Sequence, residues 1–397
     1  MTYHFAERIT ALKPSAIREI LKATSDPNLI SLAAGSPDSA SFPKAEMQDI
    51  ANHLFEQQAV TALQYGITEG YTPLREQTLE RMKSKYQTGS ENDDIIITTG
   101  GQQVIHLLTS VMISEGDVVI AEDPSFVGAL NCFRSAGAVV KGVSMDDEGM
   151  KMDELEELLR TTHRVKFVYV IPTFQNPSGR TMSLARRKKL LELADQYDFL
   201  ILEDGPYFEL RFSGDPVPNI KSMDTSGRVI FSGSYSKVLS PGMRIGFAIG
   251  PKEVIGKMTI SKQTSDVHTN LFFQMMVSEY LKQYDIDAHI AEIRKLYTVK
   301  RDAMVAACEK YFDKRVPFTR PDGGLFLWGE LPEGYSGFEL CKRATARLVA
   351  AVPGSAFSVD EDPNSRGFRM NYSLPTVEQI DKGVAILGEV MREYLAE

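Results

Sequence analysis

The chain has 397 residues, of which 43% are hydrophobic, and a formal net charge of -9. This length is enough for two domains, or for one large domain with a smaller satellite, and the apolar content supports a full core. The acidic balance argues against nucleic acid as a main partner, because proteins that bind its phosphate backbone usually carry a basic patch. The one dense basic run, residues 186–189, lies early in an expected amphipathic helix and is interpreted as a solvated face.

The three cysteines are widely spaced and form no CxxC pair, so they indicate neither a disulfide framework nor a zinc site. The six histidines are scattered without the spacing of metal ligands, and we expect no metal site. The N-terminus has no apolar signal core, and no segment reaches the roughly 18 apolar residues of a membrane span. We therefore expect a cytoplasmic protein with no membrane partner.

From about residue 90, short β-rich runs alternate with helical patterns, which is typical of a mainly parallel sheet with helices on both faces. The expected strands are Ile95–Thr99, Val118–Ala121, Phe167–Ile171, Phe199–Leu202 and Val229–Phe231. The expected helices between them are Gln102–Ile113, Met152–Arg160 and Leu184–Tyr197, each with apolar residues three or four apart.

The C-terminal part has a different pattern. A long helix is expected over Ile286–Tyr311 and a final helix over Val377–Tyr394, which together predict a smaller α+β domain. The first residues are rich in Pro, Ser and Ala and include one brief expected helix, Ser15–Ala23. We therefore expect an N-terminal arm (1–45) that joins the small domain and the active site, a large domain (46–285) and a small C-terminal domain (286–397).

The loop after Val229–Phe231 carries several hydroxyl groups, Lys237 and Arg244, and is interrupted by glycines. Such a loop predicts a phosphate site beside a reactive amine. A lysine desolvated at a strand end has a lowered pKa and becomes a nucleophile for carbonyls, including the aldehyde of pyridoxal phosphate. Taken alone, the same stretch would fit an ordinary polar loop equally well.

Polar groups also follow the other expected strands, and ligands of an open parallel sheet bind at the carboxyl ends of its strands. Gly101 and Gln102 open a helix whose backbone N–H groups would face an anion, although a tight turn is an equal alternative. Asn176 can donate a hydrogen bond to a phenolate oxygen. Asp204 can pair with a protonated pyridine nitrogen, or could simply cap a turn. Phe126 is expected to stack on the pyridine ring.

Six short motifs, in order and over nearly the full chain, resemble the class I/II family of fold-type I pyridoxal-phosphate aminotransferases. They are Leu63–Gly66, Thr68–Gly70 with Pro73–Glu76, Asn176–Gly179, Asp204 with Tyr207, Ser234-x-Ser236-Lys237 with Arg244, and Phe368–Tyr372. The resemblance implies a large cofactor-binding domain with a mainly parallel sheet of the seven-stranded type, plus a smaller α+β domain. It also implies pyridoxal 5'-phosphate as cofactor and a homodimer with shared active sites.

The resemblance implies three catalytic residues. Lys237 would form the Schiff base and move a proton as general base and acid, Asp204 would pair with the pyridine nitrogen, and Tyr207 would join Asn176 at the ring oxygen. Around the cofactor phosphate it places Gly101, Gln102, Ser234, Ser236 and Arg244, with Tyr65 reaching in from the neighbouring subunit. Arg369 would bind the α-carboxylate of the substrate, with Asn176 beside it.

Two N-terminal stretches, Pro14–Ile20 and Ser31–Asp38, resemble the 2-aminoadipate/kynurenine aminotransferase branch. Gly35 is expected at the substrate, although Ala34-Gly35-Ser36 replaces the Gly-Gly-Leu that is frequent in that branch. Arg18 is our candidate for a contact with an acidic side chain, because a planar guanidinium suits a distal carboxylate. A helix-surface arginine is an equal alternative for this residue.

The implied reaction moves an amino group from an L-amino acid, such as 2-aminoadipate, an aromatic or a branched-chain amino acid, to a 2-oxo acid, with 2-oxoglutarate expected as acceptor. One alternative is another reaction of the same cofactor, such as a C–S β-lyase. A second is the effector-sensing domain of a transcriptional regulator. The lyase stays an open alternative, whereas we do not expect the regulator, because few residues precede Ser31–Asp38 to form the winged helix that such regulators carry.

Overall fold

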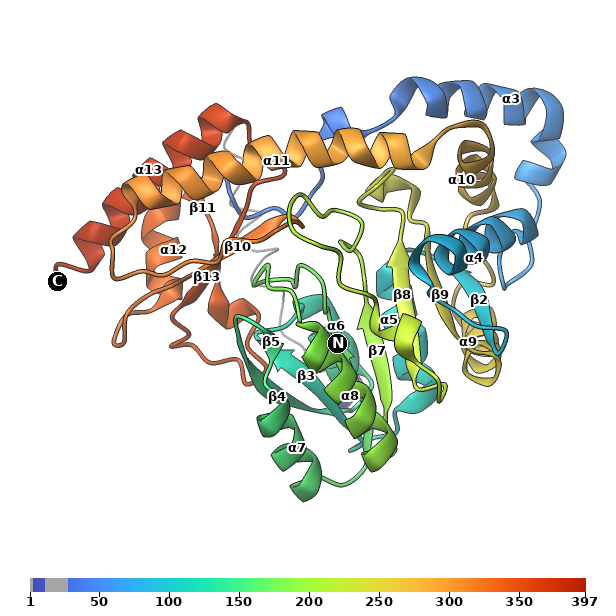
Figure 1. Ribbon diagram of the computed structural model, residues 1–397, viewed down its shortest axis with the longest axis horizontal. Coiled ribbons are helices and arrows are strands. Elements are labelled where there is room, and N and C mark those ends of the chain that lie inside the picture. The colour runs from blue at the N-terminus through green and yellow to red at the C-terminus, as the bar shows by residue number, and fades with distance from the viewer. Residues whose placement is uncertain (1–2, 11–27) are drawn as a thin grey trace.

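The computed structural model describes residues 3–10 and 28–397. An eight-stranded sheet lies at the centre of the larger part, in the order β2-β9-β8-β7-β6-β3-β4-β5 (Figure 1). Neighbouring strands run parallel from β8 to β4, whereas β9 is antiparallel to both of its neighbours. The strands are β2 (Asp93–Thr98), β3 (Val118–Asp123), β4 (Val139–Asp146), β5 (Gly149–Met150), β6 (Val165–Val170), β7 (Leu200–Asp204), β8 (Val229–Ser234) and β9 (Gly246–Pro251). The predicted mainly parallel α/β sheet is confirmed.

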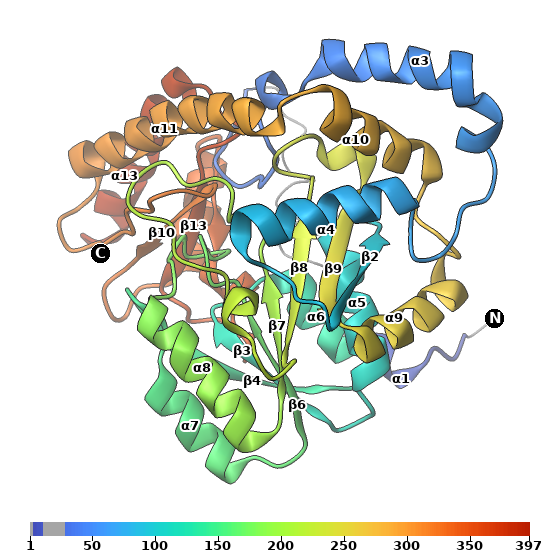
Figure 2. The ribbon, with the colours of Figure 1, turned by 45° about the vertical axis from the view of Figure 1, so that its right-hand side comes forward.

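Helices cover both faces of this sheet. The side chains of β6 show this, because they are buried alternately in two cores on opposite faces of the sheet. Phe167 and Tyr169 are buried in the first core, whereas Val168 and Val170 are buried in a separate core under the helices of the opposite face. Figure 2 shows α4 crossing in front of β8 and β9, with α7 and α8 side by side. The covering helices are α4 (Thr72–Tyr86), α5 (Gly101–Met112), α6 (Val127–Ser135), α7 (Met152–Thr161), α8 (Leu184–Tyr197) and α9 (Lys252–Ser265).

A second, smaller sheet forms beside the large one. Its strands β10 (Phe326–Glu330) and β12 (Val352–Pro353) both pair antiparallel with β13 (Gly367–Asn371), and α12 (Gly337–Ala346) and α13 (Val377–Tyr394) pack on it around a core of their own. From the N-terminal part, β1 (Ile30–Ser31) pairs in parallel with β11 (Val349–Ala350). The other helices are α1 (Glu7–Thr10), α3 (Lys44–Ala62), α10 (Leu271–Gln283) and the short 3-10 helices η1 (Ser39–Ser41), η2 (Ile220–Met223), η3 (Pro241–Met243) and η4 (Gly354–Ala356).

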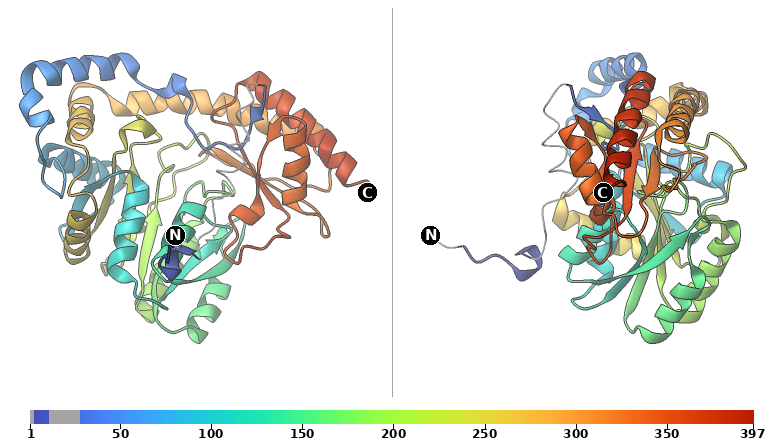
Figure 3. Two further views of the ribbon diagram at one scale, coloured as in Figure 1. Left: turned by 180° about the vertical axis from the view of Figure 1, so that it is seen from behind. Right: turned by 90° about the vertical axis from the view of Figure 1, so that its left-hand side faces the viewer.

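One long helix, α11 (Ile286–Tyr311), runs across both parts of the molecule (Figure 3). Ile290 and Ile293 in its first half are buried in the core of the large part, whereas Met304 and Cys308 in its second half are buried in the core of the small part. The predicted domain boundary after residue 285 coincides with the start of this helix, and β1 lies within the predicted arm. The three-part division of the chain stays a prediction.

Among the residues that the structure describes, no helix is long and apolar enough to cross a membrane. All three cysteines, Cys132, Cys308 and Cys341, are free and buried. The expected helix over residues 15–23 and the candidate residue Arg18 lie outside the described residues.

Candidate active site

A pocket of about 400 Å³ opens where the carboxyl ends of the central strands meet the small sheet. Most of the side chains that the sequence singled out lie in its wall, although they come from segments far apart in the chain. The predicted residues that line it are Gly35, Gly101, Gln102, Phe126, Asn176, Asp204, Tyr207, Ser234, Ser236, Lys237, Arg244 and Arg369. Strand order accounts for this convergence, because β3, β6, β7 and β8 are neighbours and end at the same edge.

Lys237 lies just beyond the end of β8 and presents its amine to the pocket. Its Nζ donates a hydrogen bond to the carbonyl of Gly35 at 3.0 Å and lies 5.9 Å from the centre of the Tyr207 ring. Burial, together with the positive charges of Arg244 and Arg369, lowers the pKa of Lys237 to about 8. More of this lysine is therefore neutral, and nucleophilic, near physiological pH than of a solvated lysine.

Asp204 is the last residue of β7 and is only 5% exposed. The hydroxyl of Tyr169, on the neighbouring strand β6, donates to its Oδ2 at 2.9 Å. Burial raises the pKa of Asp204 to about 6, and the hydrogen bond from Tyr169 opposes that rise. A buried carboxylate with a fixed donor is suited to pair with a protonated ring nitrogen, which would supply the missing positive charge.

Arg369 reaches the pocket from β13, in the small sheet. Its Nη1 donates to Asn176 Oδ1 and its Nη2 to the carbonyl of Ala33, both at 2.8 Å. Its guanidinium carbon lies 4.3 Å from the centre of the Phe326 ring. Its Nε is buried without a hydrogen-bond partner among the described residues. A buried cation with an unpaired donor is suited to an anionic ligand such as a carboxylate.

Asn176 and Tyr207 are both buried at the pocket wall. Because Asn176 uses its Oδ1 to accept from Arg369, its amide nitrogen is the group that can donate toward a ligand oxygen. The Tyr207 ring lies edge-on to Phe326, with ring centres 5.7 Å apart. Burial raises the pKa of Tyr207 above its ordinary value, so its hydroxyl keeps its proton and can donate it to a hydrogen bond.

The opposite end of the pocket has the features of an anion cradle. Gly100 caps α5 with a φ of 75°, and a Cβ at this position would lie 2.1 Å from Arg244 Nη2. Arg244 is held over this turn by a hydrogen bond from Nη2 to the carbonyl of Thr99, at 3.2 Å. The first N–H groups of α5 belong to Gly101 and Gln102, and helix N-termini with such free N–H groups bind phosphate. The Gln102 side chain itself donates to the carbonyl of Gly128 at 2.9 Å.

One predicted residue that the structure describes does not line this pocket. Tyr65 is 81% exposed, and its ring packs edge-on against His268 with the ring centres 5.8 Å apart. Arg18 lies outside the described residues. Among the described residues, no group of three or more His, Cys, Asp or Glu could hold a metal ion.

The sequence did not single out Tyr169 or several residues that line the pocket. The latter are Ile105, Ile171, Pro206, Pro241 and Phe326. Apolar residues of this kind carry no signal beyond that of a core position. Tyr169 carried a weak one, because it places a hydroxyl at a fully buried position of a central strand, where such a group needs a partner.

The family of the chain follows from comparison with known proteins. A family model described as aminotransferase class I and II matches residues 27–387, so the chain belongs to this family. It is 42% identical to aromatic-amino-acid aminotransferase 1 of Thermococcus litoralis over 99% of this chain and 95% of that protein. It is 37% identical to 2-aminoadipate transaminase of Thermus thermophilus over 99% of this chain and 97% of that protein.

Solved structures agree with this assignment. A kynurenine aminotransferase from Pyrococcus horikoshii in complex with PMP has a TM-score of 0.95 and 42% identity, covering 98% of this chain and 97% of that chain. An alpha-aminoadipate aminotransferase from Thermus thermophilus, complexed with N-(5'-phosphopyridoxyl)-L-leucine, has a TM-score of 0.90 and 36% identity, covering 99% and 98%. The protein is thus an aminotransferase of fold type I that transaminates amino acids with pyridoxal phosphate, in the aminoadipate/kynurenine branch.

The residues present fit this cofactor. The glycine turn lets Arg244 lie close over the start of α5, where a Cβ at Gly100 would collide with its guanidinium, and the amine of Lys237 lies in the same pocket. The buried Nε of Arg369, which has no partner among the described residues, is suited to donate to an anion in this pocket. The fold, the cofactor and the reaction class implied by the sequence are therefore confirmed.

Proposed function

We propose that the amino donor is an L-amino acid with an aromatic, 2-aminoadipate-like or other long side chain, and that the acceptor is 2-oxoglutarate. Relatives named for aromatic amino acids, 2-aminoadipate and kynurenine support this range of donors. The pocket supports it as well, because Ile105, Pro206 and Phe326 give its wall an apolar surface beside Arg369. Arg369 can bind the α-carboxylate of either substrate, which is the group that donor and acceptor share.

When bound, pyridoxal phosphate supplies an aldehyde for the substrate amine and an electron sink for the electrons left at its Cα. We propose that Lys237 would hold the cofactor through its Nζ and would act as the general base that takes the proton from the substrate Cα. Asp204 would pair with the ring nitrogen and keep it protonated, and Asn176 and Tyr207 would donate to the ring oxygen. Phe126 would stack on the ring, while Ser234, Ser236, Arg244 and the N-terminus of α5 would bind the phosphate.

We also propose that the enzyme is a homodimer whose subunits complete each other's sites. The second half of α3 and the residues after it expose a series of apolar side chains, namely Phe55, Val60, Leu63, Tyr65 and Ile67. Exposed apolar patches of this kind mark protein interfaces. Tyr65, exposed in the single subunit, would be free to donate its hydroxyl to the phosphate of the partner's cofactor. The cytoplasm is proposed as the compartment, since buried free cysteines such as Cys132 suit a reducing environment.

A panel of donors tests the proposed substrates. Holoenzyme is incubated with phenylalanine, kynurenine, 2-aminoadipate, leucine or aspartate, and the cofactor absorbance is followed before and after 2-oxoglutarate is added. We expect the long donors to convert the cofactor and 2-oxoglutarate to restore it, with Lys237→Ala inactive throughout. Failure of every donor with 2-oxoglutarate would contradict the proposal, and pyruvate released from a sulfur amino acid without acceptor would indicate a β-lyase instead.

Arg18 is proposed to contact the distal carboxylate of an acidic donor. The kcat/KM of Arg18→Gln is measured for 2-aminoadipate and for leucine. Loss of the contact is expected to lower the value for 2-aminoadipate by about tenfold or more and to leave leucine nearly unchanged. An unchanged ratio between the two donors would show that Arg18 lies elsewhere.

A further inference from the structure

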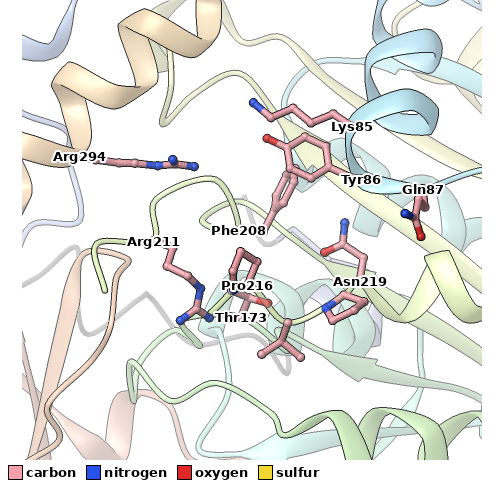
Figure 4. A pocket seen from close by; sticks show the side chains of 11 residues that line it. Lys85, Tyr86, Gln87, Thr173, Phe208, Arg211, Pro216, Asn219 and Arg294 are labelled. Atoms are coloured by element: carbon pink, nitrogen blue, oxygen red, sulfur yellow. The ribbon is translucent and has the colours of Figure 1, made fainter. Parts of the chain in front are cut away.

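A second cavity, of about 230 Å³, lies apart from the active site between the end of α4, the loop after β7 and the first half of α11 (Figure 4). Figure 4 shows Lys85 and Arg294 in its upper part and Arg211 in its lower part. Within the described part of the chain, the cavity shares no lining residue with the cofactor pocket. Of the described residues, three cationic side chains and no carboxylate line it, although Asp322 lies beside Arg211 and Asp287 beside Lys85.

The Arg211 side chain is held in place by its neighbours, but one nitrogen of its guanidinium group has no hydrogen-bond partner among the described residues. Its side chain is 11% exposed, and its guanidinium carbon lies 4.8 Å from the centre of the Phe174 ring. Nη1 donates to the carbonyl of Ser213 at 3.2 Å and lies 3.8 Å from Asp322 Oδ2. Nη2 is buried and has no hydrogen-bond partner among the described residues. An unpaired buried donor is costly, so the site calls for an acceptor that the protein does not supply.

Arg294 provides the cavity with a second guanidinium group whose terminal nitrogens have no hydrogen-bond partner among the described residues. Its Nε donates to the carbonyl of Glu209 at 2.7 Å, which leaves its two terminal nitrogens without a hydrogen bond to any other described residue. Burial lowers the pKa of Arg211, the carboxylates of Asp322 and Asp215 oppose this, and the positive charge of Arg294 adds to it, so the two cations repel each other. Lys85 is different, because it is already paired with Asp287 at the rim.

We propose that this cavity is a binding site for a small oxyanion, a phosphate or carboxylate group held between Arg211 and Arg294. Two guanidinium groups that face one cavity match the acceptor oxygens of such a group. Phe208 and Pro216 in the wall leave room for a small apolar body attached to it. This site would take no part in the chemical steps of transamination, because the residues proposed for the cofactor and the substrate line the other pocket.

Occupancy of this site would affect the loop that carries part of the active site. The segment that begins with Pro206 and Tyr207 at the cofactor pocket continues through Phe208 and Arg211 to Pro218 in the wall of the second cavity. An anion bound to Arg211 and Arg294 would connect this loop to α11. We therefore expect it to slow hydrogen exchange of the loop amides in residues 208–215.

The test is calorimetric titration of the holoenzyme with inorganic phosphate at constant ionic strength, with acetate in a second arm to compare phosphate with carboxylate. Bound cofactor keeps phosphate out of its own cradle. We expect one saturable site per chain for at least one of the two anions, with affinity reduced about tenfold or more in Arg211→Gln and in Arg294→Gln. The cofactor absorbance should stay constant through the titration.

Arg320→Gln is the matched control, because Arg320 also lies over an aromatic ring, 4.5 Å from the centre of Phe318, but does not line the cavity. It should bind the anion like the unaltered enzyme. Having two independent variants keeps the test valid if one of them fails to fold. The proposal is overturned if neither anion binds saturably, if both variants bind as the unaltered enzyme does, or if the cofactor absorbance titrates with the same midpoint.

Discussion

The amine of Lys237 lies in the field of two guanidinium groups, and its protonation depends on them. Arg244 and Arg369 both lower its pKa, in addition to burial, to about 8. Only the neutral amine attacks an aldehyde. The rate at which apoenzyme takes up pyridoxal phosphate covalently should therefore rise with pH and level off above about 8.

Removing one of these charges should shift that profile. In Arg244→Gln the pKa of Lys237 rises because a repelling cation is lost, so the midpoint of the uptake rate should move to higher pH, whatever happens to the rate itself. Stopped-flow absorbance at a series of pH values measures it. A midpoint that stays in place would show that the charge of Arg244 does not contribute to the pKa of Lys237.

The hydroxyl of Tyr169 donates a hydrogen bond to the Asp204 carboxylate at 2.9 Å. Tyr169→Phe removes a bond that lowers the pKa of Asp204, so this pKa should rise above about 6. Less of the carboxylate is then ionised at mildly acidic pH, and the acid limb of the kcat profile should move to higher pH.

Tyr372→Phe is the control for this change. Tyr372 is also fully buried, and its hydroxyl donates to the carbonyl of Gly323 at 2.9 Å rather than to Asp204. It should lose stability without moving the acid limb. If both variants shift the profile equally, Tyr169 acts through packing only.

The site residues that carry a polar group at a strand end could be predicted from the sequence. The residues that hydrogen-bond to them from behind, such as Tyr169, could not. Lys237, Asp204, Asn176 and Arg369 each carry chemistry that few other residues supply, and the structure brings them into one pocket. Tyr169 instead sits in an apolar strand pattern that predicts burial, and so indicates that its hydroxyl needs a partner but not which residue that partner is. Its partner is known only once β6 and β7 are placed side by side.

At the scale of elements, the turn from β2 into α5 determines the shape of the phosphate cradle. Gly100 has a φ of 75°, and any Cβ there would collide with Arg244. Gly100→Ala should therefore displace the arginine, weaken cofactor binding about tenfold or more, and cost about 1 kcal/mol of stability through backbone strain. Absorbance titration of apoenzyme with pyridoxal phosphate and urea unfolding measure the two effects.

Gly256→Ala is the matched control for Gly100→Ala. Gly256 lies inside α9, and a Cβ there would meet nothing within 4 Å. The change should leave cofactor affinity unaltered and stabilise the helix by about 0.5–1 kcal/mol. Equal cofactor affinity in the two variants would argue against the proposed cradle.

The first and last residues of a helix could be predicted where apolar residues recur at regular helical spacing. The sequence pattern places α8, α11 and α13 at the residues where the structure has them, because each has an amphipathic period over several turns. Strand β4 was not predicted. Lys141, Gly142 and Ser144 interrupt its apolar run, and only Val143 among its residues is buried, so nothing in the local pattern separates it from a loop.

At the scale of the whole molecule, the proposed dimer makes a prediction that a single subunit could not fulfil. If Tyr65 acts on the partner's cofactor, a Tyr65→Ala subunit paired with a Lys237→Ala subunit has one site with both residues intact. Mixing the two inactive or weakened proteins should then restore activity at low cofactor concentration. Light scattering gives the mass of the mixed species, and no recovery in confirmed hybrid dimers would contradict the shared site.

Helix α11 buries Ile290 in one core and Met304 in the other. If one core unfolds, the apolar side chains of its half of α11 become exposed to water. The other core is then destabilised too, because it packs against the same helix. The two parts should melt cooperatively, and scanning calorimetry should show one heat-absorption peak rather than two. An enzyme with two cores would in this respect behave as a single folding unit, and destabilising substitutions in the small sheet should also lower the temperature at which the cofactor is released.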